Sequence, residues 1–235
     1  LLVKRGEQLV SHLRMSYREL RFGPLSIPAC LICDVATLPE SRRRGFAAAL
    51  LSEAHRRMQR DGIRLALLKT RSAPLYARHG WSVCFRHSYC TAGARDLLAA
   101  LPAMAPSDEG IQPLSDRQPR PPLTVRLWRH VEQAGLMRLY DQDTISRFGA
   151  THRDETYWRW HVSRRGYDRI YVAIEGPDKV DLDDTCRPIV GYAVMREGRI
   201  VELVTAADRL DVASVLVQRA GMDAIEHDDH AVRLD

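Results

Sequence analysis

The sequence has little lysine and no long apolar run, and both shortages limit the classes of protein it can belong to. Three of the 35 basic residues are lysine, and such an arginine bias is typical of a GC-rich bacterial genome. No apolar stretch approaches the roughly 20 residues that a membrane-spanning helix needs. No signal-peptide pattern opens the sequence, and we therefore expect a cytoplasmic protein without a membrane partner.

Cysteines are few, and their spacing does not favour a metal site. The five are an odd number, and only Cys30-x-x-Cys33 has a spacing that zinc sites use. Residues three apart in an extended strand face opposite sides, so this pair is badly placed to share a metal ion or a disulfide. We expect free, buried thiols and no metal.

Composition indicates a globular protein of about two modest domains. The chain has 235 residues, of which 45% are hydrophobic and 28% charged. Its net charge of +5 suits an anionic ligand, but the excess is spread along the whole chain. A basic patch interleaved with aromatic residues is missing, so we expect no nucleic-acid partner.

The most informative stretch is residues 35–51. A β-branched apolar run ends at Pro39, a basic turn containing Gly45 follows, and an alanine- and leucine-rich segment at helical spacing begins directly afterwards. This order predicts a strand, a turn and a helix. The free amides of the helix's first turn, together with about half a positive charge from the helix dipole, favour a phosphate there.

The turn has the residue types that a polyanionic ligand needs. Gly45 and Ala47 are small where such a ligand must approach the backbone closely. Three consecutive arginines add positive charge, which neutralises a polyanionic ligand that the backbone amides alone would not hold. They are Arg42, Arg43 and Arg44.

The first half of the chain predicts a β-α-β arrangement around this turn. A hairpin of residues 7–20 and 27–37 leads into an amphipathic helix at 44–60, which Gly62 ends. Residues 63–69 predict a buried strand parallel to the one before the helix. The turn then lies at the carboxyl edge of the sheet, where open α/β folds bind ligands. A short helix at 73–79 and a strand at 81–91 follow.

The second half repeats this order of elements. Residues 102–122 hold six of the twelve prolines and predict a linker. Beyond it we expect strands at 123–128, 169–174, 189–195 and 199–205, and helices at 131–148, 154–161 and 208–220. We therefore expect domains at 1–101 and 123–235. The counterpart of the basic turn, residues 206–211, has no glycine and two carboxylates, so it predicts a structural or substrate-shaping domain.

Two ordered motifs carry a family resemblance. The spacing Arg42-x-x-Gly45-x-Ala47 after the strand 35–39 resembles the acetyl-CoA pyrophosphate loop of the GCN5-related N-acetyltransferases (GNAT). Residues 73–81, APLYARHGW, are similar to the segment where that family's helix carries a tyrosine and turns through glycine. The resemblance implies a mixed α/β fold. The combination of an intact first domain with a degenerate second one resembles the enhanced intracellular survival (Eis) family of tandem-domain bacterial acetyltransferases.

The resemblance implies acetyl-CoA as co-substrate and an amine, of a small molecule or a protein, as acceptor. It nominates Tyr76 as the general acid that protonates the departing thiolate, although a tyrosine packed in the core beneath Trp81 is the alternative. Residues implied in cofactor binding are Val35, Ala36, Thr37, Arg42, Arg43, Arg44, Gly45, Phe46, Ala47, Ala48, Arg71 and Ser72. A non-catalytic acyl-CoA-binding scaffold is the rival function.

Several points stay open at the level of sequence. The sequence does not identify the general base. His79 and His87 lie near Tyr76 in the sequence. The related family uses the carboxylate of its C-terminus, and Asp235 supplies that group only if it is the true end of the chain. A set of aromatic residues in the second half either packs in the core or lines a pocket for a cationic substrate. They are Tyr157, Trp158, Trp160 and Tyr167. The oligomeric state, a homo-oligomer included, is undecided. We expect the chain to lack its natural N-terminus and a further C-terminal domain.

Overall fold

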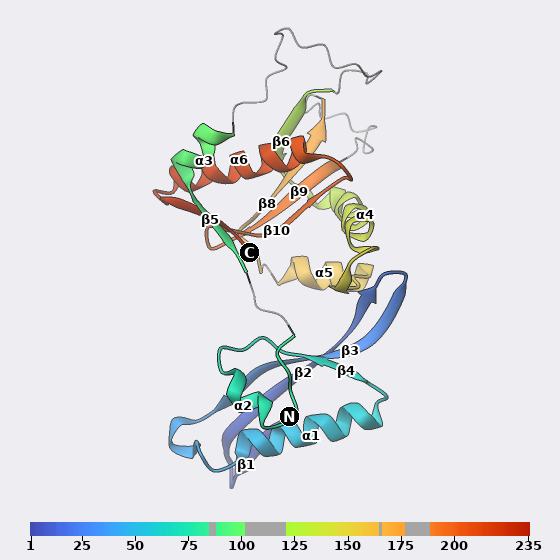
Figure 1. Ribbon diagram of the computed structural model, residues 1–235, viewed down its shortest axis with the longest axis vertical. Coiled ribbons are helices and arrows are strands. Elements are labelled where there is room, and N and C mark those ends of the chain that lie inside the picture. The colour runs from blue at the N-terminus through green and yellow to red at the C-terminus, as the bar shows by residue number, and fades with distance from the viewer. Residues whose placement is uncertain (85–87, 102–120, 165, 177–188) are drawn as a thin grey trace. The chain divides into compact units, whose positions relative to one another are not determined.

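The computed structural model describes residues 1–84, 88–101, 121–164, 166–176 and 189–235, and the chain divides into two compact units (Figure 1). The first unit is Leu1–Arg86 with Thr144–His152, and the second is His87–Asp143 with Arg153–Asp235. The chain therefore enters each unit twice. These units differ from the expected limits of 1–101 and 123–235, and most of the expected linker lies outside the described residues.

The first unit is built on a five-stranded sheet. Its strands are β1 (Leu2–Arg5), β2 (Gln8–Phe22), β3 (Leu25–Thr37), β4 (Leu65–Leu67) and β7 (Phe148–Thr151). The order is β1-β2-β3-β4, and β7 pairs with the far end of β2. The predicted hairpin is confirmed, and Gly23, with φ of 62°, turns the chain between its strands.

Helix α1 (Phe46–Arg60) connects β3 to β4, which run parallel as predicted. Its apolar face buries Leu50, Leu51, Ala54 and Met58 against the sheet residues Leu13, Cys30 and Ile32. The helix is amphipathic because its arginines lie on the opposite side. This packing fixes the start of α1 relative to the end of β3.

Of the strand predicted at 81–91, only residues 90–91 lie in a strand, and residues 81–84 and 88–89 do not. After α2 (Ala73–Ala77), residues 81–84 have no regular structure, and the next strand, β5 (Cys90–Gly93), belongs to the second unit. The side chain of Val83 is exposed, so the segment does not alternate into a core. Residues 85–87 lie outside the described part of the chain. The expected burial of the cysteines holds for Cys30 but not for Cys84 and Cys90, which are exposed.

The second unit is a six-stranded sheet with helices on both faces. The order is β5-β11-β10-β9-β8-β6, with β6 at Leu123–Leu127, β8 at Arg169–Glu175, β9 at Ile189–Arg196, β10 at Arg199–Thr205 and β11 at Ala231–Leu234. Helices α3 (Ala94–Ala100) and α6 (Leu210–Glu226) cover one face in Figure 1, and α4 (Gln133–Thr144) and α5 (Glu155–Ser163) the other. Short 3-10 turns occur at Pro39–Ser41 and His130–Glu132. Within the described residues, no helix is both long and apolar enough to cross a membrane.

The elements predicted for the second half are present, most with shifted bounds, and the structure adds the strands β7 and β11. The helix expected at 131–148 spans only Gln133–Thr144, and residues 148–151 form β7, in which Gly149 has a left-handed backbone (φ of 83°). The ring of Phe148 packs edge-on against Phe22 of β2, with centroids 6.1 Å apart. Strand β11, parallel to β10, was not predicted.

A buried ion pair stabilises the α4 and α5 side of the second unit. Arg153 binds Glu202 through two hydrogen bonds of 2.9 and 2.5 Å, and Tyr192 donates to the same carboxylate at 2.6 Å. The guanidinium also lies 3.9 Å from the ring centroid of Tyr140. Burial alone would lower the pKa of Arg153, but the bond to Glu202 raises it. Burial also raises the pKa of Tyr192, so both groups keep one protonation state.

His161, beside this ion pair, makes the stability of the second unit depend on pH. Burial lowers its pKa, and the charge of Arg153 lowers it further. Below about pH 6.5 the unfolded chain therefore binds a proton that the folded unit resists, and the free energy of unfolding falls as the pH drops. We expect urea denaturation to show this loss between about pH 7 and pH 5. The variant His161→Gln should flatten that part of the profile; an identical pH slope would contradict the assignment.

Candidate active site

The connection from β3 to α1 forms an open turn at the start of the helix. Arg43 and Gly45 have left-handed backbones, with φ of 61° and 82°, and α1 begins at Phe46. No side chain caps this helix. Within the described part of the chain, no protein group accepts a hydrogen bond from the amides of Phe46, Ala47 and Ala48. These donors point out of the helix and are open to an anionic ligand.

The three arginines predicted to bind an anion surround this turn. Arg42, Arg43 and Arg44 are all exposed. Among the described residues no carboxylate forms an ion pair with any of them, and Arg42 donates from Nε to the carbonyl of Thr37 at 3.3 Å. Their positive charge adds to that of the helix N-terminus. The turn thus combines free amides with uncompensated charge.

The carboxyl end of β3 has one open edge beside the turn. Strand β4 pairs with β3 only from Ala29 to Leu31, and the register ends there. The carbonyl of Ala36 accepts from Ser11 Oγ of β2 at 2.9 Å, so Ala36 faces β2. Because successive residues of a strand face opposite edges, the neighbouring Thr37 faces the edge that β4 leaves open, where its carbonyl accepts from Arg42 Nε. An extended ligand can pair there as a further strand.

Tyr76 lies on α2, where its half-buried ring packs on the same apolar cluster as Val35 and the buried face of α1. No described residue forms a hydrogen bond with its hydroxyl. Arg71 and Ser72, just before α2, are exposed, and the Ser72 amide donates to Thr70 Oγ1 at 2.9 Å. The structure therefore brings Tyr76 and Val35 to one cluster. The packing of Tyr76 on Trp81, given above as the alternative for this tyrosine, is present, with ring centroids 6.4 Å apart.

The corresponding turn of the second unit is occupied by its own side chains. Asp208 takes the left-handed conformation (φ of 58°), and Arg209 precedes α6. The Arg209 guanidinium lies between Asp211, at 2.9 Å, and Glu175, at 2.5 Å. Its side chain is only 10% exposed. The carboxylates of Asp211 and Glu175 are therefore neutralised by Arg209, and these ion pairs lie at the start of α6.

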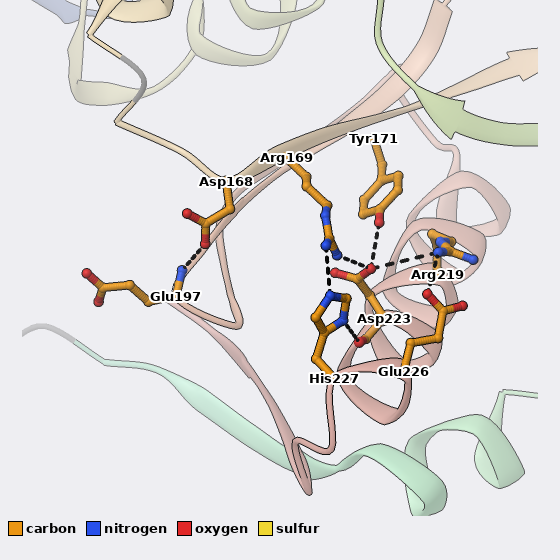
Figure 2. A network of polar contacts seen from close by, with 8 residues as sticks. All are labelled: Asp168, Arg169, Tyr171, Glu197, Arg219, Asp223, Glu226 and His227. Carbon is orange, nitrogen blue, oxygen red and sulfur yellow. Dashed lines mark hydrogen bonds and ion pairs between the residues drawn. The ribbon is translucent and has the colours of Figure 1, made fainter.

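A second polar network lies at the other end of α6 (Figure 2). Asp223 accepts from the hydroxyl of Tyr171 at 2.8 Å and from Arg169, both on β8. Arg169 also donates to Nε2 of His227 at 2.8 Å, while Nδ1 of that ring faces the Asp223 carbonyl at 2.7 Å. A pocket of about 330 Å³ opens above these groups. Since its charges are paired with one another, the network serves to hold α6 on the sheet.

The comparisons with known proteins identify the first unit. A family model described as an acetyltransferase (GNAT) domain matches residues 1–84. Residues 1–84 are a GNAT domain. The match spans both predicted motifs, the turn at Arg42 to Ala47 and the helix of Tyr76. No curated protein matches the chain.

Solved structures resemble the fold of nearly the whole chain. A protein of unknown function from Enterococcus faecalis, described as a probable N-acyltransferase, matches with a TM-score of 0.70 and 17% identity over 98% of this chain and 53% of its own. A GCN5-related N-acetyltransferase from Kribbella flavida matches with a TM-score of 0.66 and 17% identity, over 97% and 50%. Eis1 from Mycobacterium abscessus matches with 0.58 and 17%, over 99% and 55%. The likeness in fold to these structures therefore covers nearly the whole of this chain.

The chain spans about half the length of these three structures, with coverage of 53%, 50% and 55%. At 17% identity the likeness concerns the fold.

Proposed function

We propose that this protein is an acetyl-CoA-dependent N-acetyltransferase that moves an acetyl group to an amine by direct attack in a ternary complex. One observation carries the proposal: the uncapped start of α1, with Arg42, Arg43 and Arg44 around it, adjoins the open edge of β3. A diphosphate needs the first feature and an extended amide-containing arm needs the second. Both belong to one short connection within the GNAT domain.

In this proposal each part of the donor has its own protein partner. Amides from Arg43 to Ala48 bind the diphosphate, with Gly45 and Ala47 allowing close approach. Val35 and Thr37 pair with the pantetheine arm, and Ala36 lies between them with its carbonyl on β2. Arg71 and Ser72 flank the arm. The first unit thus holds the thioester, and the second unit is structural or substrate-shaping and binds no donor.

The reaction requires one proton to reach the sulfur. The neutral amine attacks the thioester carbonyl, a C–N bond forms, and the C–S bond breaks as the thiolate departs. The amine loses a proton to a base or to solvent. Tyr76 donates its phenolic proton to the thiolate, and solvent restores it; the ordinary pKa values of about 10 for a phenol and about 8.5 for a thiol are close enough for this transfer.

Thiol release measured with acetyl-CoA and a panel of amines tests the proposal. The panel includes an aminoglycoside-like polyamine, small amino metabolites and a lysine-containing peptide. We expect release that depends on both acetyl-CoA and one class of amine. The rival, a non-catalytic acyl-CoA-binding scaffold, would bind coenzyme A and release no thiol with any of them. A cytoplasmic location is expected as well, and the proposal does not depend on the oligomeric state.

Replacing Tyr76 by phenylalanine should lower turnover by about 10²-fold, because general-acid catalysis contributes about that much. The affinity for coenzyme A should stay nearly unchanged, since the hydroxyl makes no contact that holds the fold. Steady-state kinetics and calorimetry on the same preparation measure both quantities. Unchanged turnover in Tyr76→Phe would remove this residue from the mechanism.

A further inference from the structure

The chain leaves α2 in a tight turn that folds Trp81 back onto Tyr76. The amides of His79 and Trp81 both donate to the Tyr76 carbonyl, at 2.8 and 3.3 Å, and Gly80 has a left-handed backbone with φ of 81°. The two rings meet edge to face, with centroids 6.4 Å apart and planes at 78°. The turn therefore gives the Tyr76 ring a fixed aromatic neighbour.

The same indole is held from its other side by α1. The ring of His55 stacks on Trp81 with centroids 5.6 Å apart and planes at 25°. The indole Nε1 is buried and has no hydrogen-bond partner in the described structure, so packing alone fixes the ring. Trp81 is thus packed between a side chain of α1 and the aromatic ring of Tyr76.

We propose that Trp81 is a positioning residue that fixes the Tyr76 phenol relative to α1 through His55. This inference rests on the proposed function, in which Tyr76 is the acid and the start of α1 holds the diphosphate. One rigid helix then sets both ends of the donor: its first turn holds the diphosphate, and its His55 supports the group that faces the sulfur. Proton transfer depends on such placement, because a displacement of about 1 Å can cost about 10²-fold in rate.

A double-mutant cycle tests this role. Trp81→Leu should lower kcat by about tenfold while KM for acetyl-CoA stays within about twofold, because the donor site is untouched. Trp81→Phe keeps an aromatic edge and should retain nearly full kcat, which guards against a variant that fails to fold. In a Tyr76→Phe background, Trp81→Leu should cause no further loss of kcat. Leu75→Ala, an exposed site on the same helix, is the matched control and should change nothing.

Two further results would decide against the inference. If the losses from Trp81→Leu and Tyr76→Phe multiply, Trp81 acts on the fold rather than on the phenol. The ring resonances of ¹³C-labelled Tyr76 give a readout that needs no turnover, and they should shift and broaden in Trp81→Leu but not in Leu75→Ala. Unchanged resonances would overturn the positioning role. Absence of thiol release from the wild type would instead refute the proposed function and leave this NMR test valid.

Discussion

Gly45→Val is expected to weaken coenzyme A binding by about 10³-fold. Gly45 has φ of 82°, a conformation that costs an L-residue about 1–2 kcal/mol and a β-branched one more. Valine would turn the chain away from this conformation and misalign the amides that follow. Hydrogen bonds to a charged group contribute about 1.5–3 kcal/mol each, so losing two accounts for the expected change. Isothermal titration calorimetry with coenzyme A measures it.

The chain offers a matched control at the other end of α1. Gly62 also has a left-handed backbone, with φ of 70°, and a β-carbon at either glycine would meet no atom within 4 Å. Gly62→Val therefore carries a similar backbone cost but lies away from the turn. We expect similar losses of thermal stability in the two variants and loss of coenzyme A binding in Gly45→Val only. If both variants bound coenzyme A with equal affinity, the turn at Gly45 would not be part of the donor site.

Glu202→Gln is expected to destabilise the second unit by about 3–5 kcal/mol, the usual cost of removing one partner of a buried ion pair. The side chains of Arg153 and Glu202 are only 12% and 18% exposed, so the guanidinium would be left with its charge unpaired. The glutamine amide would also place donors against the donors of Arg153. Chemical denaturation followed by circular dichroism measures the loss.

Glu155→Gln is the comparison within the same unit. Glu155 lies 3.8 Å from Arg159 in a pair whose side chains are 70% and 67% exposed. Water screens such pairs, and their loss typically costs less than about 1 kcal/mol. Should Glu202→Gln cost no more than Glu155→Gln, the pair of Arg153 and Glu202 would not be the buried support described above.

The sequence predicted β3, the turn and α1 because their signals are local and consecutive. A β-branched run, a glycine and an apolar spacing of three to four residues lie within residues 35–60, and no distant residue is needed to interpret them. The strand predicted at 81–91 did not form at residues 81–84, for the opposite reason. The ring of Trp81 packs against the rings of His55 and Tyr76. Trp81 is therefore partly buried without the residues after it forming a strand of the sheet.

The short strands β5, β7 and β11 depend on partners far along the chain. Phe148 of β7 pairs with Phe22 of β2, and Cys90 of β5 pairs with Leu234 of β11. Four residues carry too little pattern to predict such pairing, and the exposed Phe148 gives no sign of a buried face.

The second turn illustrates the same limit at the level of chemistry. Its two aspartates and its lack of glycine predicted a structural or substrate-shaping domain, and the structure pairs Asp211 with Arg209 and brings Glu175 to the same guanidinium. The obstacle to an anion there is a set of internal ion pairs at the start of α6, which spacing alone does not reveal. Glu175 precedes Arg209 by 34 residues, so only the folded sheet brings them together.

The central claim is that the first-turn amides of α1 hold the diphosphate of coenzyme A. A ¹⁵N-labelled chain titrated with coenzyme A tests it directly by the chemical shifts of its backbone amides. We expect the largest shifts at Gly45, Phe46, Ala47 and Ala48, and none at residues 206–211 of the second unit. Unchanged shifts in the first group, or larger ones in the second, would contradict the account.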